Sequence, residues 1–304
     1  MTGFILFISV FGVVYGLRIY GRSQARHEHY TRLCAAPPVD PGDIVFNYSD
    51  LNLTHEQLHD MLMRRFPYYV SLRPSLKNRF IDRLDQFMWT KTFIIKDTKG
   101  VKEMPVLVSA AAIQLTFGIK GYKLPFYKYI RIYPSEYFSD QEFLKILAGN
   151  VQGNVISIAW NHVLDGYAFP NDGTNTPLHE MSHALYIQKQ VINANYAWKF
   201  HSGYHDLMKQ ISHAHKQESK EEKDNYSEYA ETNLQEFWAE SVELFFEKPE
   251  LLATQYPNVF KSMVLLLSQD PRNPENPLVK QKLSLKERYR RVSLLLNMKE
   301  ERNT

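Results

Sequence analysis

One five-residue pattern constrains this chain more than any other feature: residues 179–183 read HEMSH, which has the form HExxH. In an α-helix, residues four apart lie on one face, so the imidazoles of His179 and His183 can bind the same zinc ion. The intervening Glu180 is then turned toward a zinc-bound water, as a general base requires. The pattern therefore predicts an active-site helix with two metal ligands.

The residues around the motif also favour a helix. We expect Thr176 to be its N-cap and Pro177 its first helical residue, where the missing N–H of proline costs nothing. Apolar side chains on the other faces can pack against a core: Leu178, Ala184, Leu185 and Ile187. A pattern with only three fixed letters also occurs by chance. A metal site is therefore indicated only if a third ligand comes from elsewhere in the chain.

Cysteine usage limits the kind of zinc site. The chain has 304 residues but a single cysteine, Cys34, which excludes an internal disulfide framework and a cysteine-based zinc site. A metal must then be held by histidine and carboxylate. Cys34 lies beside a Pro-rich stretch, and we interpret it as a linker thiol rather than a nucleophile.

The N-terminus predicts a membrane anchor. Residues 4–17 carry no charge, and with the next apolar residues the run approaches the length of a short transmembrane helix. Arginines follow the run and none precedes it. The positive-inside rule then predicts a single-pass protein of the inner (cytoplasmic) membrane whose catalytic domain faces the cytoplasm. The alternatives are a cleaved signal peptide or an interfacial segment. We divide the chain into an anchor at 1–21, a basic and Pro-rich juxtamembrane linker at 22–45, and one domain at 46–304.

The distribution of charge argues against a nucleic-acid partner. Four arginines and one glutamate give residues 18–33 a net charge of +3, which equals the net charge of the whole chain. The remaining residues of the large domain are formally neutral, and a lipid surface explains the basic cluster. We therefore expect no binding of nucleic acid.

Hydrophobic periodicity predicts an α+β fold that is mostly helical. The expected helices lie at about 54–66, 74–89 and 106–117, and Thr54 with Gln57 fits a capping box at the start of the first. The expected strands lie at about 92–96, 127–133 and 155–160. The strands thus form a small region ahead of the active-site helix.

A further helix carries a stripe of acids. Apolar residues at helical spacing follow Asn225 and end at Lys248-Pro249, with glutamates at steps of four, three and four: Glu236, Glu240, Glu243 and Glu247. One interpretation is a solvated acidic face. The other is that its N-terminal part faces the HExxH helix, with one carboxylate as zinc ligand and an acid beyond it orienting a ligand imidazole. Glu236 with Glu240 fits the second interpretation, and Glu243 is a further candidate for the orienting acid.

Two longer segments resemble the signature regions of a known family. Residues 156–185 (ISIAWNHVLDGYAFPNDGTNTPLHEMSHAL) and 233–256 (NLQEFWAESVELFFEKPELLATQY) are similar to those of the MtfA-type zinc-dependent peptidases, a gluzincin-like family. The apolar helix expected at 106–117 resembles the Ala-rich helix of that family. The resemblance covers most of the large domain and implies a zincin-like metallopeptidase fold.

The resemblance also implies roles for particular residues. Glu236 would be the third zinc ligand. Tyr229, seven residues earlier, would donate a hydrogen bond to the tetrahedral oxyanion, although by position alone it is an ordinary tyrosine. The implied enzyme is a zinc metallopeptidase with one Zn²⁺ per chain, in which a zinc-bound water attacks the peptide bond and Glu180 is the general base. Whether it acts as an endopeptidase or an aminopeptidase is left open.

An alternative function belongs to a different class. The chain would then be a membrane-tethered regulatory module of MtfA type that sequesters a cytoplasmic regulatory protein, with a structural or weakly active zinc site. The intact Glu180 argues against this, because a structural site has no need of a general base. The expected partners are a peptide or protein substrate and, through the N-terminal helix, the membrane.

Overall fold

The computed structural model describes residues 35–97, 99–138, 145–191, 207, 209–210 and 234–279. The expected anchor at 1–21 and residues 22–34 of the expected linker lie outside these ranges. Within the described residues, no helix combines the length and the apolar character that crossing a bilayer requires.

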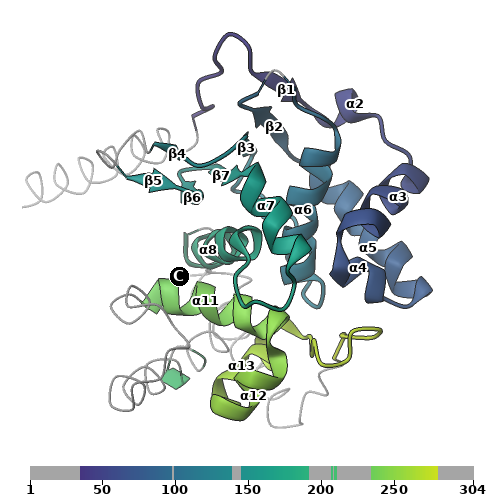
Figure 1. The fold of residues 1–304 in the computed structure, drawn as a ribbon, viewed down its shortest axis with the longest axis vertical. Helices are drawn as coiled ribbons and strands as arrows, with labels where there is room; N and C mark the ends of the chain where they lie inside the picture. Colours follow the sequence, from purple (N-terminus) through teal and green to yellow (C-terminus); the bar gives the residue numbers. More distant parts are fainter. Residues whose placement is uncertain are drawn as a thin grey trace, which may run out of the picture.

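A mixed five-stranded sheet forms one layer of the domain (Figure 1). The strands lie in the order β1 (Ile44–Phe46), β2 (Thr92–Ile95), β3 (Tyr129–Tyr133), β7 (Val155–Ala159) and β6 (Gly149–Gln152). The inner three are parallel, and β1 and β6 pair with them antiparallel. Ile44 and Val45 were expected in the linker but form a strand, because they pair with β2.

Register places isoleucines of neighbouring strands side by side. Ile130 pairs with Ile156 and Ile132 with Ile158, and all four are fully buried. Successive side chains of a strand point to opposite faces, so these residues form one apolar face of the sheet. A short hairpin of β4 (Tyr137–Phe138) and β5 (Ile146–Leu147) precedes β6, which is one of the two edge strands of the sheet.

Helix α6 (Glu103–Thr116) is the central helix of the domain. Every residue in it except Glu103 is buried, as its lack of other charged side chains predicts. It begins three residues before the start expected at 106. Pro105 is tolerated there because the first turn of a helix has no backbone hydrogen bonds for its missing N–H to break.

Four helices precede α6 in the chain: α2 (Tyr48–Leu51), α3 (His55–Arg65), α4 (Pro67–Ser71) and α5 (Pro74–Met88). The expected capping box is confirmed, since the Thr54 hydroxyl accepts a hydrogen bond from the Gln57 backbone N–H and the Gln57 side chain accepts one from Thr54. Both α3 and α5 pack on α6.

One of the helices that the sequence did not predict follows strand β7 directly. Strand β7 ends at Ala159, and Trp160 opens helix α7 (Trp160–Ala168), where the sequence suggested the end of a strand followed by a loop. Helix α8 (Thr176–Val191), which carries the HExxH motif, follows. The last described helices are α11 (Leu234–Glu247), α12 (Pro249–Gln255) and α13 (Pro257–Leu267).

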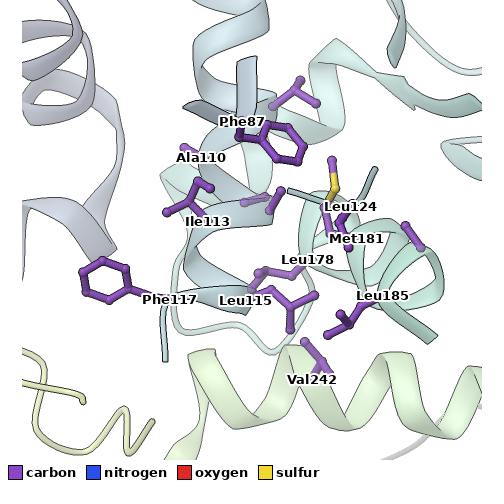
Figure 2. Close-up of a cluster of buried hydrophobic side chains, with 14 of the residues drawn as sticks. Phe87, Ala110, Ile113, Leu115, Phe117, Leu124, Leu178, Met181, Leu185 and Val242 are labelled. Atoms are coloured by element: carbon purple, nitrogen blue, oxygen red, sulfur yellow. The ribbon is translucent and has the colours of Figure 1, made fainter. Parts of the chain in front are cut away.

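The helices form layers below the sheet, with α8 next to the sheet and α11 below α8 (Figure 1). Figure 2 shows the apolar cluster where α6, α8 and α11 meet; its fully buried members include Ile113, Leu115, Leu178, Met181 and Val242. Burying each such side chain stabilises the fold by about 1.5–3 kcal/mol. This packing fixes α8 and α11 against each other, and those two helices carry the HExxH motif and the acidic stripe.

Candidate metal centre

Helix α8 presents both histidines of the motif on one face. His179 Nε2 and His183 Nε2 lie 3.1 Å apart, as their separation by one helical turn allows. The start of the helix differs by one residue from the expected one. Thr176 is the first helical residue, and Asn175 is the cap, because its Oδ1 accepts a hydrogen bond from the Leu178 N–H at 3.1 Å.

Helix α11 supplies the carboxylate that completes the group. Glu236 Oε2 lies 3.1 Å from His179 Nε2, and Glu236 Oε1 lies 3.5 Å from His183 Nε2. One ligand atom from each of the three residues can be chosen so that all lie within 4.8 Å of one another. Among the described residues, no other group of three or more His, Cys, Asp and Glu side chains meets this criterion.

These distances fit a zinc site. With zinc–ligand bonds of about 2.0–2.1 Å, ligand atoms at the corners of a tetrahedron lie about 3.3 Å apart. The two imidazole Nε2 atoms lie 3.1 Å apart, and one oxygen of Glu236 lies 3.1 Å from His179 Nε2 while its other oxygen lies 3.5 Å from His183 Nε2. Two imidazoles and one carboxylate are also a ligand set of catalytic zinc sites, which keep one position open.

The electrostatics of the group are those of a cation site. Burial raises the pKa of Glu236, but hydrogen bonds from His179 and His183 outweigh this and hold the pKa well below its usual value. Burial lowers the pKa of His179, but hydrogen bonds to Glu236 and Glu243 outweigh this and raise it well above its usual value. Negative charge is therefore concentrated around the imidazoles, where a metal ion would offset it.

Glu243 orients one of the imidazoles. Its Oε2 lies 3.0 Å from His179 Nδ1, and its side chain is almost fully buried. A carboxylate on Nδ1 keeps the proton there and leaves Nε2 free to bind metal. The sequence suggested Glu240 as the acid one turn beyond the ligand, but Glu243, two turns beyond it, occupies this position. The interpretation of the stripe as a solvated face is wrong for Glu243 and Glu247, which are both 5% exposed.

Glu180 points toward the edge strand of the sheet. A Cβ added to Gly149 of β6 would lie 2.5 Å from Glu180 Cγ and 2.7 Å from its Oε1, so only glycine permits this close approach. Glu180 is 6% exposed, and its Oε2 has no hydrogen-bond partner among the described residues. Burial raises the pKa of Glu180 to about 7, against the opposing effect of His179 and His183.

The charge of Glu180 also acts on a tyrosine that the sequence did not single out. The Tyr137 hydroxyl of β4 donates a hydrogen bond to Asn150 Oδ1 at 2.8 Å, and its ring stacks on Tyr133 with centroids 3.7 Å apart. Burial, and after it the charge of Glu180, raises the pKa of Tyr137 well above its usual value. No local sequence pattern identifies this residue as part of the site. Its position depends on the hairpin of β4 and β5 and not on spacing within a single element. Tyr229, expected to act on the oxyanion, lies outside the described residues.

The family model of the glucose-regulated metallo-peptidases M90 matches residues 50–266, which include α8 and α11. The chain belongs to this family. The match confirms the resemblance found in the sequence. Members of the M90 family are metallopeptidases, so this chain belongs to a class of hydrolases that act on peptides or proteins. A comparison with curated proteins gives no match.

Proposed function

We propose that this member of the M90 family is a zinc-dependent peptidase with one Zn²⁺ per chain, held by His179, His183 and Glu236. The observation that carries this proposal is the geometry of the group: His179 and His183 of α8 and Glu236 of α11 each offer one ligand atom, and these atoms lie within 4.8 Å of one another, as binding to one zinc ion requires. Family membership supports the choice of peptide bonds as substrate.

Bound zinc would supply Lewis-acid chemistry, polarising the scissile carbonyl and lowering the pKa of water to about 7. The chain supplies the proton transfers. Glu180 takes the proton from the attacking water and gives it to the leaving amine. Its unpartnered Oε2 supports this role, since the oxygen is buried on the helix that carries both histidines and no other described group uses its lone pairs.

Two further groups prepare the reaction. Glu243 accepts a hydrogen bond from the Nδ1–H of His179 and thereby keeps the lone pair of Nε2 directed toward Glu236 and His183. We assign Tyr229 as the donor of a hydrogen bond to the tetrahedral oxyanion, an interaction worth about 3 kcal/mol in comparable sites. This assignment rests on the family resemblance of the sequence around Glu236.

The Glu180→Gln variant tests the proposal because it keeps the size of the side chain and removes the proton acceptor. We expect zinc content to persist while hydrolysis of a peptide library falls by about a hundredfold or more. Glu250→Gln, on the exposed part of α12, is the matched control. Equal rates of hydrolysis by the zinc-loaded wild type and Glu180→Gln would contradict the proposed peptidase function and favour the alternative function as a regulatory module. Peptides with blocked N-termini separate endopeptidase from aminopeptidase action.

We also propose that residues 1–21 anchor the protein in the inner membrane, with the catalytic domain in the cytoplasm. The support is the uncharged run 4–17 followed by arginines. The full chain should sediment with membranes, a chain starting near Val45 should stay in the supernatant, and a reporter fused after Thr304 should be active in the cytoplasm. A reporter active on the other side of the membrane would contradict this orientation.

A further inference from the structure

Asn175 precedes the active-site helix and connects directly to the proposed metal centre through its backbone. Its N–H donates a hydrogen bond of 2.6 Å to Glu243 Oε1, while the other oxygen of that carboxylate contacts His179 Nδ1. Its C=O accepts the first helical hydrogen bond, from the His179 N–H at 2.9 Å. The Glu243 carboxylate is therefore held between two donors, the Asn175 N–H and the His179 imidazole.

The Asn175 side chain uses its remaining hydrogen-bonding capacity. Oδ1 caps α8 at the Leu178 N–H, and Nδ2 donates to Gly166 O at 3.0 Å and to Glu247 Oε1 at 2.8 Å. Asn175 is 4% exposed. An amide with both donors and its acceptor engaged in a buried setting has a single orientation, because any rotation leaves a polar group unsatisfied.

Glu247 holds the loop at a second point. Its Oε2 accepts a hydrogen bond of 2.9 Å from the Gly173 N–H. Gly173 has φ of +87°, a left-handed conformation that glycine adopts without strain. The last glutamate of the stripe thus fixes the loop that leads into α8, while Glu243, one turn earlier on α11, contacts both that loop and the ligand His179.

We propose that Asn175 and Glu247 are positioning residues of the metal centre, which fix the Glu243 carboxylate and through it the His179 imidazole. This inference rests on the proposed zinc site. Glu243 is buried, and its charge and that of Glu180 repel each other, so the direction of its carboxylate depends on the donors that face it. Outer groups of this kind change metal affinity by about 10- to 100-fold.

The Asn175→Asp variant separates positioning from helix capping. Aspartate caps a helix as well as asparagine does, so a residue that only caps α8 would tolerate the change. The change replaces the Nδ2 donor by an oxygen that faces Glu247 and Gly166 O. We expect the full chain to bind zinc about 10-fold more weakly, measured by competition with a chromophoric chelator. The same substitution at Asn47, the N-cap residue of α2, is the control and should leave zinc affinity unchanged.

A donor–acceptor swap provides the rescue. In the double variant Asn175→Asp/Glu247→Gln, the new amide at 247 can donate to the new carboxylate at 175 and still accept from the Gly173 N–H. We expect it to regain most of the lost zinc affinity, and the absorption spectrum of its Co²⁺ form to return toward that of the wild type. The inference would be overturned if Asn175→Asp bound zinc as tightly as the wild type. It would also be overturned if the double variant bound zinc no more tightly than the single variant.

Two further measurements keep the outcomes apart. If Asn175→Asp does not fold, Glu247→Gln alone should weaken zinc binding, and unchanged affinity in that variant would also overturn the inference. If the wild type binds zinc but hydrolyses no peptide, only the proposed peptidase activity is contradicted. The positioning role is still tested, because its experiment measures zinc affinity. A wild type that binds no zinc contradicts the proposed function itself.

Discussion

At the scale of the residue, the glutamates of α11 show how environment gives one side chain several roles. Glu236 contacts both imidazoles, Glu243 contacts the far side of one imidazole, and Glu247 contacts a loop. All three are carboxylates on one helix, separated by one or two turns. What each does depends on the group that α8 and its preceding loop bring opposite to it.

The first prediction ranks these carboxylates by zinc affinity. Glu236→Gln should weaken zinc binding by more than about 100-fold, because it removes a bond to the ion, and Glu243→Gln by about 10- to 100-fold, because it only disorients a ligand. Glu240→Gln should have the smallest effect of the three. Zinc titration against a chelator gives the order. An equal loss in all three variants would contradict the assignment of Glu236 as ligand.

The second prediction concerns a buried lysine far from the motif. Lys91 is 3% exposed, and its Nζ donates hydrogen bonds to the carbonyls of Lys123 and Leu124 and lies 4.6 Å from the centroid of the Phe87 ring. Burial lowers the pKa of Lys91 to about 7, from 10.5 in the unfolded chain. Between these values the unfolded state binds the additional proton, so the free energy of unfolding rises with pH, by up to about 1.4 kcal/mol per unit.

Replacement by methionine removes this titration. We therefore expect the free energy of unfolding of the wild type to rise relative to that of Lys91→Met as the pH increases from 7.5 to 9.5. Urea unfolding of both proteins measures this difference. A difference that stays constant over this range would mean that Lys91 is charged in the folded protein.

At the scale of the element, the site depends on how closely β6 approaches α8. The edge strand passes Glu180 at Gly149, where a methyl group would overlap the glutamate side chain. In addition, the Trp238 indole N–H of α11 donates to the Ser182 carbonyl of α8 at 3.1 Å. The strand thus limits where the Glu180 carboxylate can lie, and α11 holds the helix that carries it.

The third prediction follows from this contact. Gly149→Ala should displace the Glu180 carboxylate but not the metal ligands, so hydrolysis should fall by about 10-fold or more while zinc content stays near one per chain. Gln152→Ala, at an exposed position of the same strand, is the control. Peptide turnover and metal analysis on the same samples measure both quantities. Loss of zinc from Gly149→Ala would mean that the strand supports the ligands as well.

At the scale of the whole molecule, the proposed metal centre joins parts that are distant in sequence. His179 and Glu236 are separated by 57 residues, and α6, from the first half of the chain, packs against α8. A metal bound to both α8 and α11 therefore links elements of the same core and stabilises the folded chain as a whole.

The fourth prediction is thermal. At a free zinc concentration of about 1,000 times the dissociation constant, binding adds about 4 kcal/mol to the free energy of unfolding, which corresponds to about 10 °C in Tm for a domain of this size. Chelator should lower the Tm of the wild type by this amount, and added zinc should restore it. In His183→Ala, chelator and zinc should leave the Tm nearly unchanged. Equal shifts in both proteins would place the metal elsewhere.

The sequence alone determined features that depend on neighbours within a few residues. The capping box of α3, the burial of α6 and the common face of His179 and His183 follow from spacing within single helices. The family resemblance could also be recognised from continuous segments of the sequence, residues 156–185 and 233–256. Helix α7 and the Asn175 cap also have local sequence signals. The strand pattern before α7 and the Thr-Pro pair after Asn175 nevertheless led to different predictions.

Only the tertiary structure decided which acid meets which histidine. Glu240 and Glu243 are equivalent by pattern, and the rotation of α11 against α8 places Glu243 on the imidazole. Strand β6 and Tyr137 likewise reach the site through pairing and a hairpin rather than through periodicity. The physical reason is that local sequence fixes the face of an element, whereas the position of that face depends on the core into which the element packs.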